Sequence, residues 1–290
     1  MTIRSRTVLA ALLLLLAGRP AAAQTSEPAQ AAQPTQPAQP AEPATSDPDR
    51  RVDPLQPDFS LAALPTTLRV PQGKGSFRVT HRFTRSLGRG DFGDLLSDFF
   101  GFDSGAQIGL EFRYGLLPGT QLGVHRTSDR TIQIFGQQSL LRQAPDGHPI
   151  GLDAIATLEG TNNLRGQRSS AIGLLVSRKV GRIAALYAEP IFVVNSSPFD
   201  EGDNDTLMLG LGGRVRVRPA LYLVGEISPR LAGYDPGVSQ ASFGIEMRSG
   251  GHTFQINVSN GIGTTLAQVS RGAVDNNSWF IGFNIARKFF

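Results

Sequence analysis

The chain has 290 residues, a formal net charge of +4 and no cysteine. The lack of cysteine excludes a disulfide scaffold, a thiolate metal site and a lipid-bearing cysteine after a signal peptide. The modest charge accompanies no nucleic-acid-binding motif, so we expect no nucleic acid partner.

Residues 1–23 have the pattern of a secretory signal peptide. Arg4 and Arg6 precede an apolar run from Val8 to Ala17, and small residues follow at 21–23. Such a pattern directs export and is then cleaved, and the apolar run is too short to cross a bilayer as a helix.

Residues 24–60 are rich in proline, alanine and glutamine and hold few large apolar side chains. A segment of this composition buries too little surface to offset its ordering entropy. We expect a disordered periplasmic linker here, through which the protein can also contact a periplasmic partner. The remaining residues, 61–290, suffice for one large domain.

The hydrophobic period in this domain is two, which is typical of strands. Residues 107–114 place Ile108, Leu110 and Phe112 on one face and polar residues on the other. Twelve strands are predicted, near 76–87, 106–115, 120–127, 130–141, 150–159, 169–180, 182–194, 206–218, 220–229, 238–248, 251–259 and 278–289. Most exceed the usual length of about five or six residues and suit the roughly 9–11 residues that cross a bilayer.

The connections between these strands alternate in length. Short turns at 116–119, 181, 219 and 249–250 alternate with long loops such as 88–105, 195–205 and 260–277, although the connection at 128–129 on the long side is short. Outer-membrane barrels have short periplasmic turns and long outer loops, and an even strand number puts both ends in the periplasm. We therefore predict an all-β protein, a closed antiparallel transmembrane β-barrel of about twelve strands in the bacterial outer membrane. A soluble β-sandwich is the alternative.

The stretch WFIGFNIARKFF, 279–290, has the alternation of a last barrel strand. Its lipid-facing register includes Trp279, Phe283 and Phe289, whereas Phe280 falls on the inner face and Phe290 is out of register. Residues Trp279, Phe283, Phe289 and Phe290 are predicted to form the aromatic girdle and the signal for the outer-membrane assembly machinery. The expected partners therefore include this machinery, outer-membrane lipid and lipopolysaccharide.

From Leu64-Pro65 to Phe289 the chain resembles a family of bacterial proteins described as a membrane-bound β-barrel domain. The resemblance is carried by FRVTHRFTR (77–85), FFGFDSGAQIGLEFRYGL (99–116), QLGVHRTSDRTIQIFGQQSLLRQ (121–143), LYAEP (186–190) and WFIGFNIARKF (279–289). It implies the fold and a membrane location, and it implies no activity.

The inner face is predicted to be polar and more basic than acidic. Its basic residues are Arg78, Arg82, Arg113, Lys179, Arg214, Arg216, Arg248 and Lys288, and its acidic residues are Glu111, Glu226 and Glu246, with Asp153 and Glu159 as further candidates. Such a lining favours a narrow pore for small, mildly anionic solutes. A closed interior filled with ion pairs, in a structural or partner-binding barrel, is the alternative.

A lipid hydrolase or acyltransferase is the third hypothesis. His125 and Ser128 are the only neighbouring His/Ser pair, and nothing in the pattern orients them. We expect no catalytic site, no cofactor and no metal site. Acidic residues in two loops, Asp91, Asp94, Asp98 and Asp103 and then Asp200, Glu201, Asp203 and Asp205, form no complete calcium loop.

Overall fold

The computed structural model describes residues 51–145, 147–197 and 204–290. The predicted signal peptide and the predicted linker up to residue 50 lie outside the described residues. Within the described residues, no helix is long and apolar enough to cross a bilayer.

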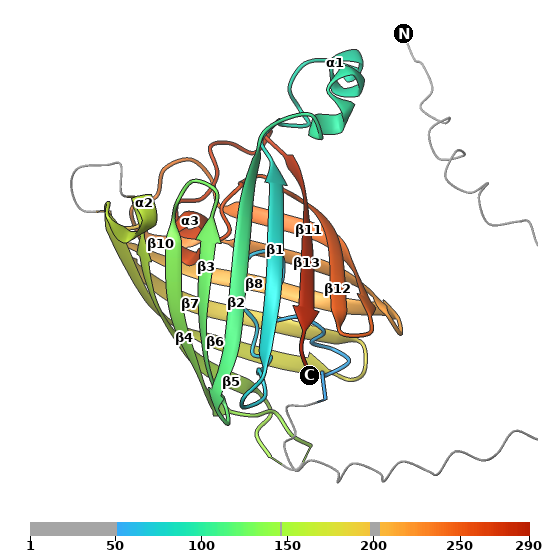
Figure 1. Cartoon of the computed structure of the whole chain (residues 1–290), viewed down its shortest axis with the longest axis vertical. Coiled ribbons are helices and arrows are strands. Elements are labelled where there is room, and N and C mark those ends of the chain that lie inside the picture. The colour runs from blue at the N-terminus through green and yellow to red at the C-terminus, as the bar shows by residue number, and fades with distance from the viewer. Residues whose placement is uncertain (1–50, 146, 198–203) are drawn as a thin grey trace, which may run out of the picture. The chain divides into compact units, whose positions relative to one another are not determined.

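The described chain is built from strands joined in one antiparallel sheet (Figure 1). The strands are β1 (Gly75–Phe83), β2 (Ala106–Leu117), β3 (Thr120–Thr127), β4 (Ile132–Leu141), β5 (Gly151–Gly160), β6 (Arg168–Val180), β7 (Ala184–Val194), β8 (Thr206–Arg218), β9 (Leu221–Ser228), β10 (Arg230–Gly233), β11 (Gln240–Ser249), β12 (His252–Ser259) and β13 (Phe280–Lys288). Short helices occupy the connections: α1 (Phe92–Ser97), η2 (Phe99–Gly101), α2 (Thr161–Leu164) and α3 (Leu266–Ser270).

The sheet closes because β1 pairs with β13, with Val79 opposite Ile285. Strands β9 and β10 both pair with β8, and β10 pairs with the first residues of β8, Thr206 to Met208. Pro229 separates β9 from β10. Proline has no N–H to give to the ladder, which accounts for the interruption. The carbonyl of Pro229 still accepts from Leu209 N at 2.8 Å. The result is the predicted closed barrel of twelve strands.

The barrel has apolar side chains outside and mainly polar ones inside along β2. Ile108, Leu110 and Phe112 are exposed, whereas Glu111 and Arg113 between them are buried. Exposed apolar side chains continue around the barrel, for example on β6, β11 and β12. An apolar surface of this extent needs lipid rather than water around it.

The two ends of the barrel differ. The short turns after β2, β6, β8 and β11 lie at one end together with the C-terminus, and the long connections lie at the other (Figure 1). We call these the turn end and the loop end. The connection that carries α1 and η2 projects beyond the loop end.

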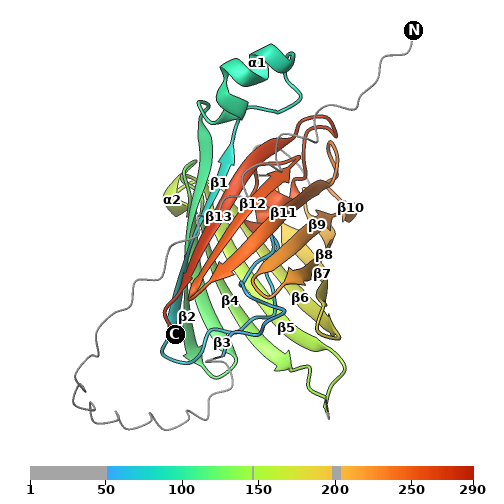
Figure 2. The same cartoon turned by 90° about the vertical axis from the view of Figure 1, so that its right-hand side faces the viewer.

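The structure corrects the predicted boundary at residue 60. Residues 55–68 are all buried, and Figure 2 shows this part of the chain, in blue, inside the barrel. The expected linker therefore ends sooner, because Leu55 and Phe59 bury their side chains in the lumen. We call residues 55–71 the plug.

Candidate functional site: the occupied lumen

The plug is a tight hairpin that rises from the turn end and returns to it before β1. Leu61 N donates to Leu64 O at 2.8 Å, and Thr66 N donates to Phe59 O at 2.8 Å. These two bonds place Ala62 and Ala63 at the buried tip of the hairpin.

On one side, the tip is held by the carboxylate of Glu226 on β9. Its oxygens accept hydrogen bonds from the backbone N–H groups of Ala62 at 3.0 Å, Ala63 at 2.9 Å and Leu64 at 3.0 Å. Three N–H donors converge on this one carboxylate, and hydrogen bonds to a carboxylate are stronger than those between neutral groups. Glu226 thus fixes the hairpin tip to the wall.

On the other side, the tip carbonyls accept from the strands that close the barrel. Ala62 O accepts from Arg78 at 2.9 Å, from Arg82 at 3.1 Å and from Asn284 at 3.1 Å. Arg78 and Arg82 belong to β1 and Asn284 belongs to β13. The tip therefore crosses the lumen, with N–H groups toward Glu226 and carbonyls toward the arginines.

The plug also supplies negative charge to this basic wall. The Asp58 carboxylate lies 3.8 Å from Arg78 Nε and 3.9 Å from Lys288 Nζ. Arg214, which pairs with Glu246 at 2.8 Å, donates to Ser60 O at 2.9 Å. All of these charged side chains are buried, so the plug satisfies groups that would otherwise need water.

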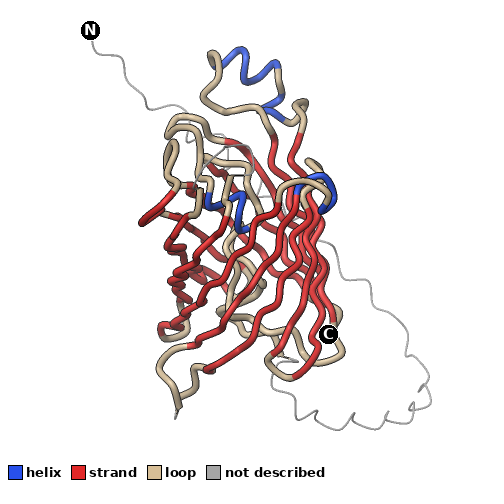
Figure 3. Tube along the Cα trace, turned by 90° about the vertical axis from the view of Figure 1, so that its left-hand side faces the viewer, coloured by secondary structure: helices blue, strands red, loops and turns tan. Residues whose placement is uncertain are grey.

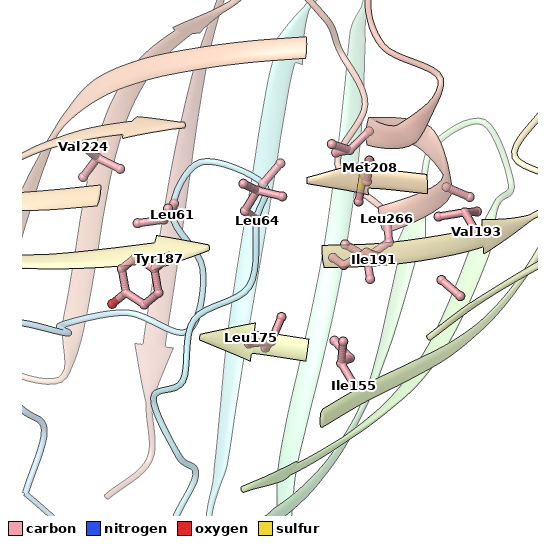
Figure 4. Close-up of a cluster of buried hydrophobic side chains, with 14 of the residues drawn as sticks. Leu61, Leu64, Ile155, Leu175, Tyr187, Ile191, Val193, Met208, Val224 and Leu266 are labelled. Atoms are coloured by element: carbon pink, nitrogen blue, oxygen red, sulfur yellow. The ribbon is translucent and has the colours of Figure 1, made fainter. Parts of the chain in front are cut away.

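The side chains of the tip pack on an apolar part of the wall. Leu61 and Leu64 belong to one buried cluster with Leu175, Ile191 and Met208 of β6, β7 and β8 (Figure 4). Gly210 and Gly212 of β8 make room for them. A Cβ at Gly212 would overlap Leu61 Cδ1, and one at Gly210 would lie 3.0 Å from Leu64.

The loop end of the lumen is filled by the connection between β12 and β13. Helix α3 is wholly buried and appears in blue among the strands (Figure 3). Thr265 caps it in a capping box with Gln268, and Leu266 N donates to Gln133 Oε1 of β4 at 2.9 Å. Leu266 joins the same apolar cluster as the plug, so the two segments meet inside the barrel.

Polar contacts tie this connection to the rim. Gln268 donates to Asp129 at 3.0 Å, and Arg271 lies 3.5 Å from Glu159 and donates to Ser196 O at 2.7 Å. Burial tends to raise the pKa of Asp129, but hydrogen bonds from Thr127 and Thr131 outweigh it and hold that pKa below its usual value.

Cavities remain at both mouths of the barrel. The one at the loop end, lined by Asp129, Arg271 and Phe280 among others, has about 420 Å³. At the turn end, a cavity of about 240 Å³ lies beside Thr67, and a larger one of about 740 Å³ lies beside Arg182. Between the plug and α3 a cavity beside Ala63 and Leu266 has about 20 Å³, space for about one water. The described residues thus fill the middle of the lumen.

The predicted lumen residues fall into two groups. Most are buried and line the lumen around the plug: Arg78, Arg82, Arg113, Arg214, Lys288, Glu111, Glu226, Glu246, Asp153 and Glu159. Lys179, Arg216 and Arg248 are partly exposed and lie at the turn end of their strands. Lys179 contacts Asp53, just before the plug, at 2.8 Å. The structure therefore brings the first group together and leaves the second at the mouth.

The sequence interpretation missed Glu189 of β7. Its side chain is fully buried, and both of its oxygens lack a hydrogen-bond partner among the described residues. The alternation Tyr187, Glu189, Ile191 was the available signal, since all three are buried on the inner face. The same alternation also indicates the apolar inner wall, which was not predicted.

The neighbouring pair His125 and Ser128 does not form a catalytic arrangement. His125 is buried with its ring 3.8 Å from Glu111, whereas Ser128 Oγ contacts Ala106 O and Gln107 near the rim. Within the described ranges, no cluster of His, Asp and Glu has the geometry of a metal site. In the first acidic loop, Asp91 caps α1 and Asp98 pairs with Arg85. Most of the second acidic loop lies outside the described residues.

The predicted aromatic girdle divides between two surroundings. The ring centroids of Trp279 and Phe243 are 5.6 Å apart, and the ring of Phe283 stacks on that of His81. Phe289 is exposed on the outer surface. Phe290 instead packs against Phe59, Leu68 and Val70 of the plug. Phe290, the residue that is out of register, thus packs inside the barrel against the plug.

These features define a membrane-spanning β-barrel whose lumen is filled by its own chain. The chain matches the family described as "Membrane bound beta barrel domain (DUF5777)" over residues 58–289, and it belongs to that family. The matched region begins within the plug.

Solved barrels of similar fold include the NanC porin, with a TM-score of 0.49, 6% identity and coverage of 75% of this chain and 100% of that one. The COG4313 outer membrane channel from Pseudomonas putida F1 has a TM-score of 0.48 and 12% identity, over 76% of this chain and 97% of that one. The KdgM porin, in complex with disordered oligogalacturonate, has a TM-score of 0.47 and 11% identity, over 74% and 99%. No curated protein matches the chain.

Proposed function

We propose that the protein is an outer-membrane channel for small solutes that the plug keeps closed. One observation carries the proposal: the tip of the plug is bound by wall side chains and not by the strand ladder. Glu226, Arg78, Arg82 and Asn284 make these contacts, and residues 55–70 pair with no barrel strand. The plug can therefore leave while the closed ladder stays intact.

A preference for anions is part of this proposal. Lys179, Arg216 and Arg248 gather at the turn-end mouth, and Arg78, Arg82 and Lys288 line the lumen on β1 and β13. Basic linings favour anion passage. Glu226 and Glu189 lie on other strands, so we expect the preference to be mild.

Export by a cleaved signal peptide and insertion by the outer-membrane assembly machinery belong to the same proposal. The proline-rich residues that precede the plug would then lie in the periplasm. A periplasmic partner bound to them would act directly on the plug, because Asp53 and Leu55 follow them in the chain.

The test is ion conductance in planar bilayers. The unmodified protein should show rare, small openings. Glu226→Ala removes the acceptor of three backbone bonds, at a cost of about 2–3 kcal/mol to plug docking, and should raise the open fraction at least about tenfold. Asp103→Ala, in the connection between β1 and β2 and away from the plug, is the matched control and should leave conductance unchanged.

Ion selectivity tests the second half of the proposal. In a salt gradient, the reversal potential of open Glu226→Ala channels should indicate anion preference, and adding Arg216→Glu should shift it toward cations. Arg218→Glu should not, because the β-bulge after Arg216 places this exposed residue opposite Leu221 and on the outer face. Equal reversal potentials for both arginine variants would refute the role of the basic mouth.

A closed structural or partner-binding barrel is the second candidate. It is favoured by the apolar cluster that joins the plug, α3 and the wall around Leu64, Ile191 and Leu266. If Glu226→Ala inserts as a folded barrel and never conducts, this second function replaces the first.

A further inference from the structure

The two sides of the plug tip present opposite groups to the wall. Ala62 O faces three donors, on Arg78, Arg82 and Asn284, at 2.9–3.1 Å. The N–H groups of Ala62, Ala63 and Leu64 face the carboxylate of Glu226 at 2.9–3.1 Å. The wall around the plug tip therefore forms a site for a group that accepts hydrogen bonds at Arg78, Arg82 and Asn284 and donates them at Glu226.

Among the described residues, the charged wall groups of this site form direct contacts with the plug and no ion pair with one another. Within the described part of the chain, Arg82 makes no ion pair with a carboxylate, and Arg78 has its carboxylate partner, Asp58, on the plug. Across the lumen Glu226 is hydrogen-bonded to plug N–H groups. When the plug leaves, Arg78 and Arg82 on β1 and Glu226 on β9 all lose the plug groups that they contact.

Glu189 strengthens the acidic side. Its buried carboxylate has no hydrogen-bond partner among the described residues, and its Cβ adjoins Gly210, against which Leu64 of the plug packs. A neutral plug backbone offers no charge to this second carboxylate. A ligand ammonium at Glu226 would bring a positive charge and three donors to this acidic side of the wall, and its hydrogen bonds to a carboxylate are stronger than those of a neutral N–H group.

We infer that the plug tip occupies a binding site for a small zwitterion, an amino acid or dipeptide, and that this ligand and the plug exclude each other. The ligand carboxylate would take the place of Ala62 O between Arg78, Arg82 and Asn284. Its ammonium would take the place of the tip N–H groups at Glu226, with Glu189 behind. This inference rests on the proposed channel function and names the solute class that would open it.

Plug release can be measured by thiol labelling because the chain has no cysteine. Ala63→Cys places a single thiol at the buried tip, where a membrane-impermeant maleimide should react slowly with the full-length protein in liposomes. Dialanine should accelerate labelling with saturation. A ligand that binds only the plug-out state shifts the equilibrium by 1 + [L]/Kd, so the rate rises about tenfold at ten times Kd.

Three comparisons identify the ligand class. Propionate supplies only the carboxylate and ethylamine only the ammonium, so each should act far more weakly than dialanine at equal ionic strength. Arg82→Gln in the Ala63→Cys background should abolish the dialanine effect, whereas Arg218→Gln, on the outer face, should preserve it. Propionate acting as strongly as dialanine would overturn the zwitterion site in favour of a simple anion site.

The unmodified chain provides a second readout, should Ala63→Cys fail to fold. Dialanine at the turn end should raise channel open probability by a factor similar to the labelling effect. If Glu226→Ala conducts while dialanine changes neither labelling nor gating, this inference is wrong and the channel function stands. If Glu226→Ala never conducts, the channel function itself is wrong.

Discussion

The lumen has two walls of opposite character. The wall of β1, β2 and β11–β13 is polar and charged, with Arg78, Arg113, Glu246 and Asn284 buried on its inner face. The wall of β5–β8 carries the largest group of buried apolar side chains, Ile155, Leu175, Ile191, Val193 and Met208, although Glu189 and Arg214 are also buried on it.

The plug matches both walls at once. Its backbone carbonyls and Asp58 face the polar wall, and Leu61 and Leu64 pack on the apolar one. Water alone would solvate the first wall well and the second poorly. A filling with both backbone groups and leucine side chains therefore matches the lumen better than water does, and the following changes test each wall in turn.

The largest effect is expected from a charge on the apolar wall. Leu64→Asp would bury an unpaired carboxylate where Leu64 is fully buried, which costs roughly 3 kcal/mol or more and should expel the plug. Limited proteolysis of the plug in the folded barrel would measure its release. Leu64→Met conserves volume and should leave the plug protected; equal protection of both variants would show that the apolar wall contributes little.

On the polar wall the large aromatic contact is Phe59. Its ring lies under Arg113, with 5.6 Å from ring centroid to Cζ, and meets Phe290 edge-on. Phe59→Ala should destabilise the docked plug by about 3 kcal/mol, seen as plug proteolysis at lower urea concentration. Phe92→Ala on the exposed α1 is the matched truncation and should change nothing measurable.

A smaller effect is expected where the β8 glycines accommodate the plug. Gly212→Val places a side chain where Leu61 Cδ1 now lies, so overpacking should cost about 1–3 kcal/mol and raise conductance. Adding Leu61→Ala to the Gly212→Val variant removes the overlap and should lower the conductance part of the way back to that of the unmodified protein. Failure of this rescue would mean that Gly212 acts on the strands and not through the plug.

The smallest effect should come from acid at the loop end. Because the folded pKa of Asp129 lies below its usual 3.8, its contribution to stability is present above that pH and is lost as the pH falls through the lower folded value. Protease cleavage of residues 260–279 should therefore increase as the pH falls below 3.8. Asp129→Asn should show the increased cleavage at neutral pH and little further change in acid.

The sequence predicts the barrel well because one local rule governs each strand. Alternation alone placed 120–127 and 206–218 at the observed ends of β3 and β8. It missed β10, which lies beyond the predicted strand at 220–229, because the strand direction continues past Pro229 although the ladder is interrupted there.

The plug escaped prediction for a physical reason. Leu55, Phe59, Leu61 and Leu64 follow neither a period of two nor one of 3.6, and they come directly after a proline-rich stretch. The plug is held by contacts with residues more than 100 positions away: Leu64 N donates to Glu226, and Gln56 donates to Tyr187. Residue parity identified the donors Arg78 and Arg82, but only the folded chain shows that their partner is the carbonyl of Ala62.

The contacts of Ala62 O have a consequence for assembly. This single oxygen bridges Arg78 and Arg82 of β1 and Asn284 of β13, the two strands whose pairing closes the barrel. All three donors come together only after β1 has paired with β13, so the plug can dock fully only in a completed barrel. An unfinished barrel would leave the tip undocked, and any force that withdraws the plug from a finished one also removes a fastening across the closing seam.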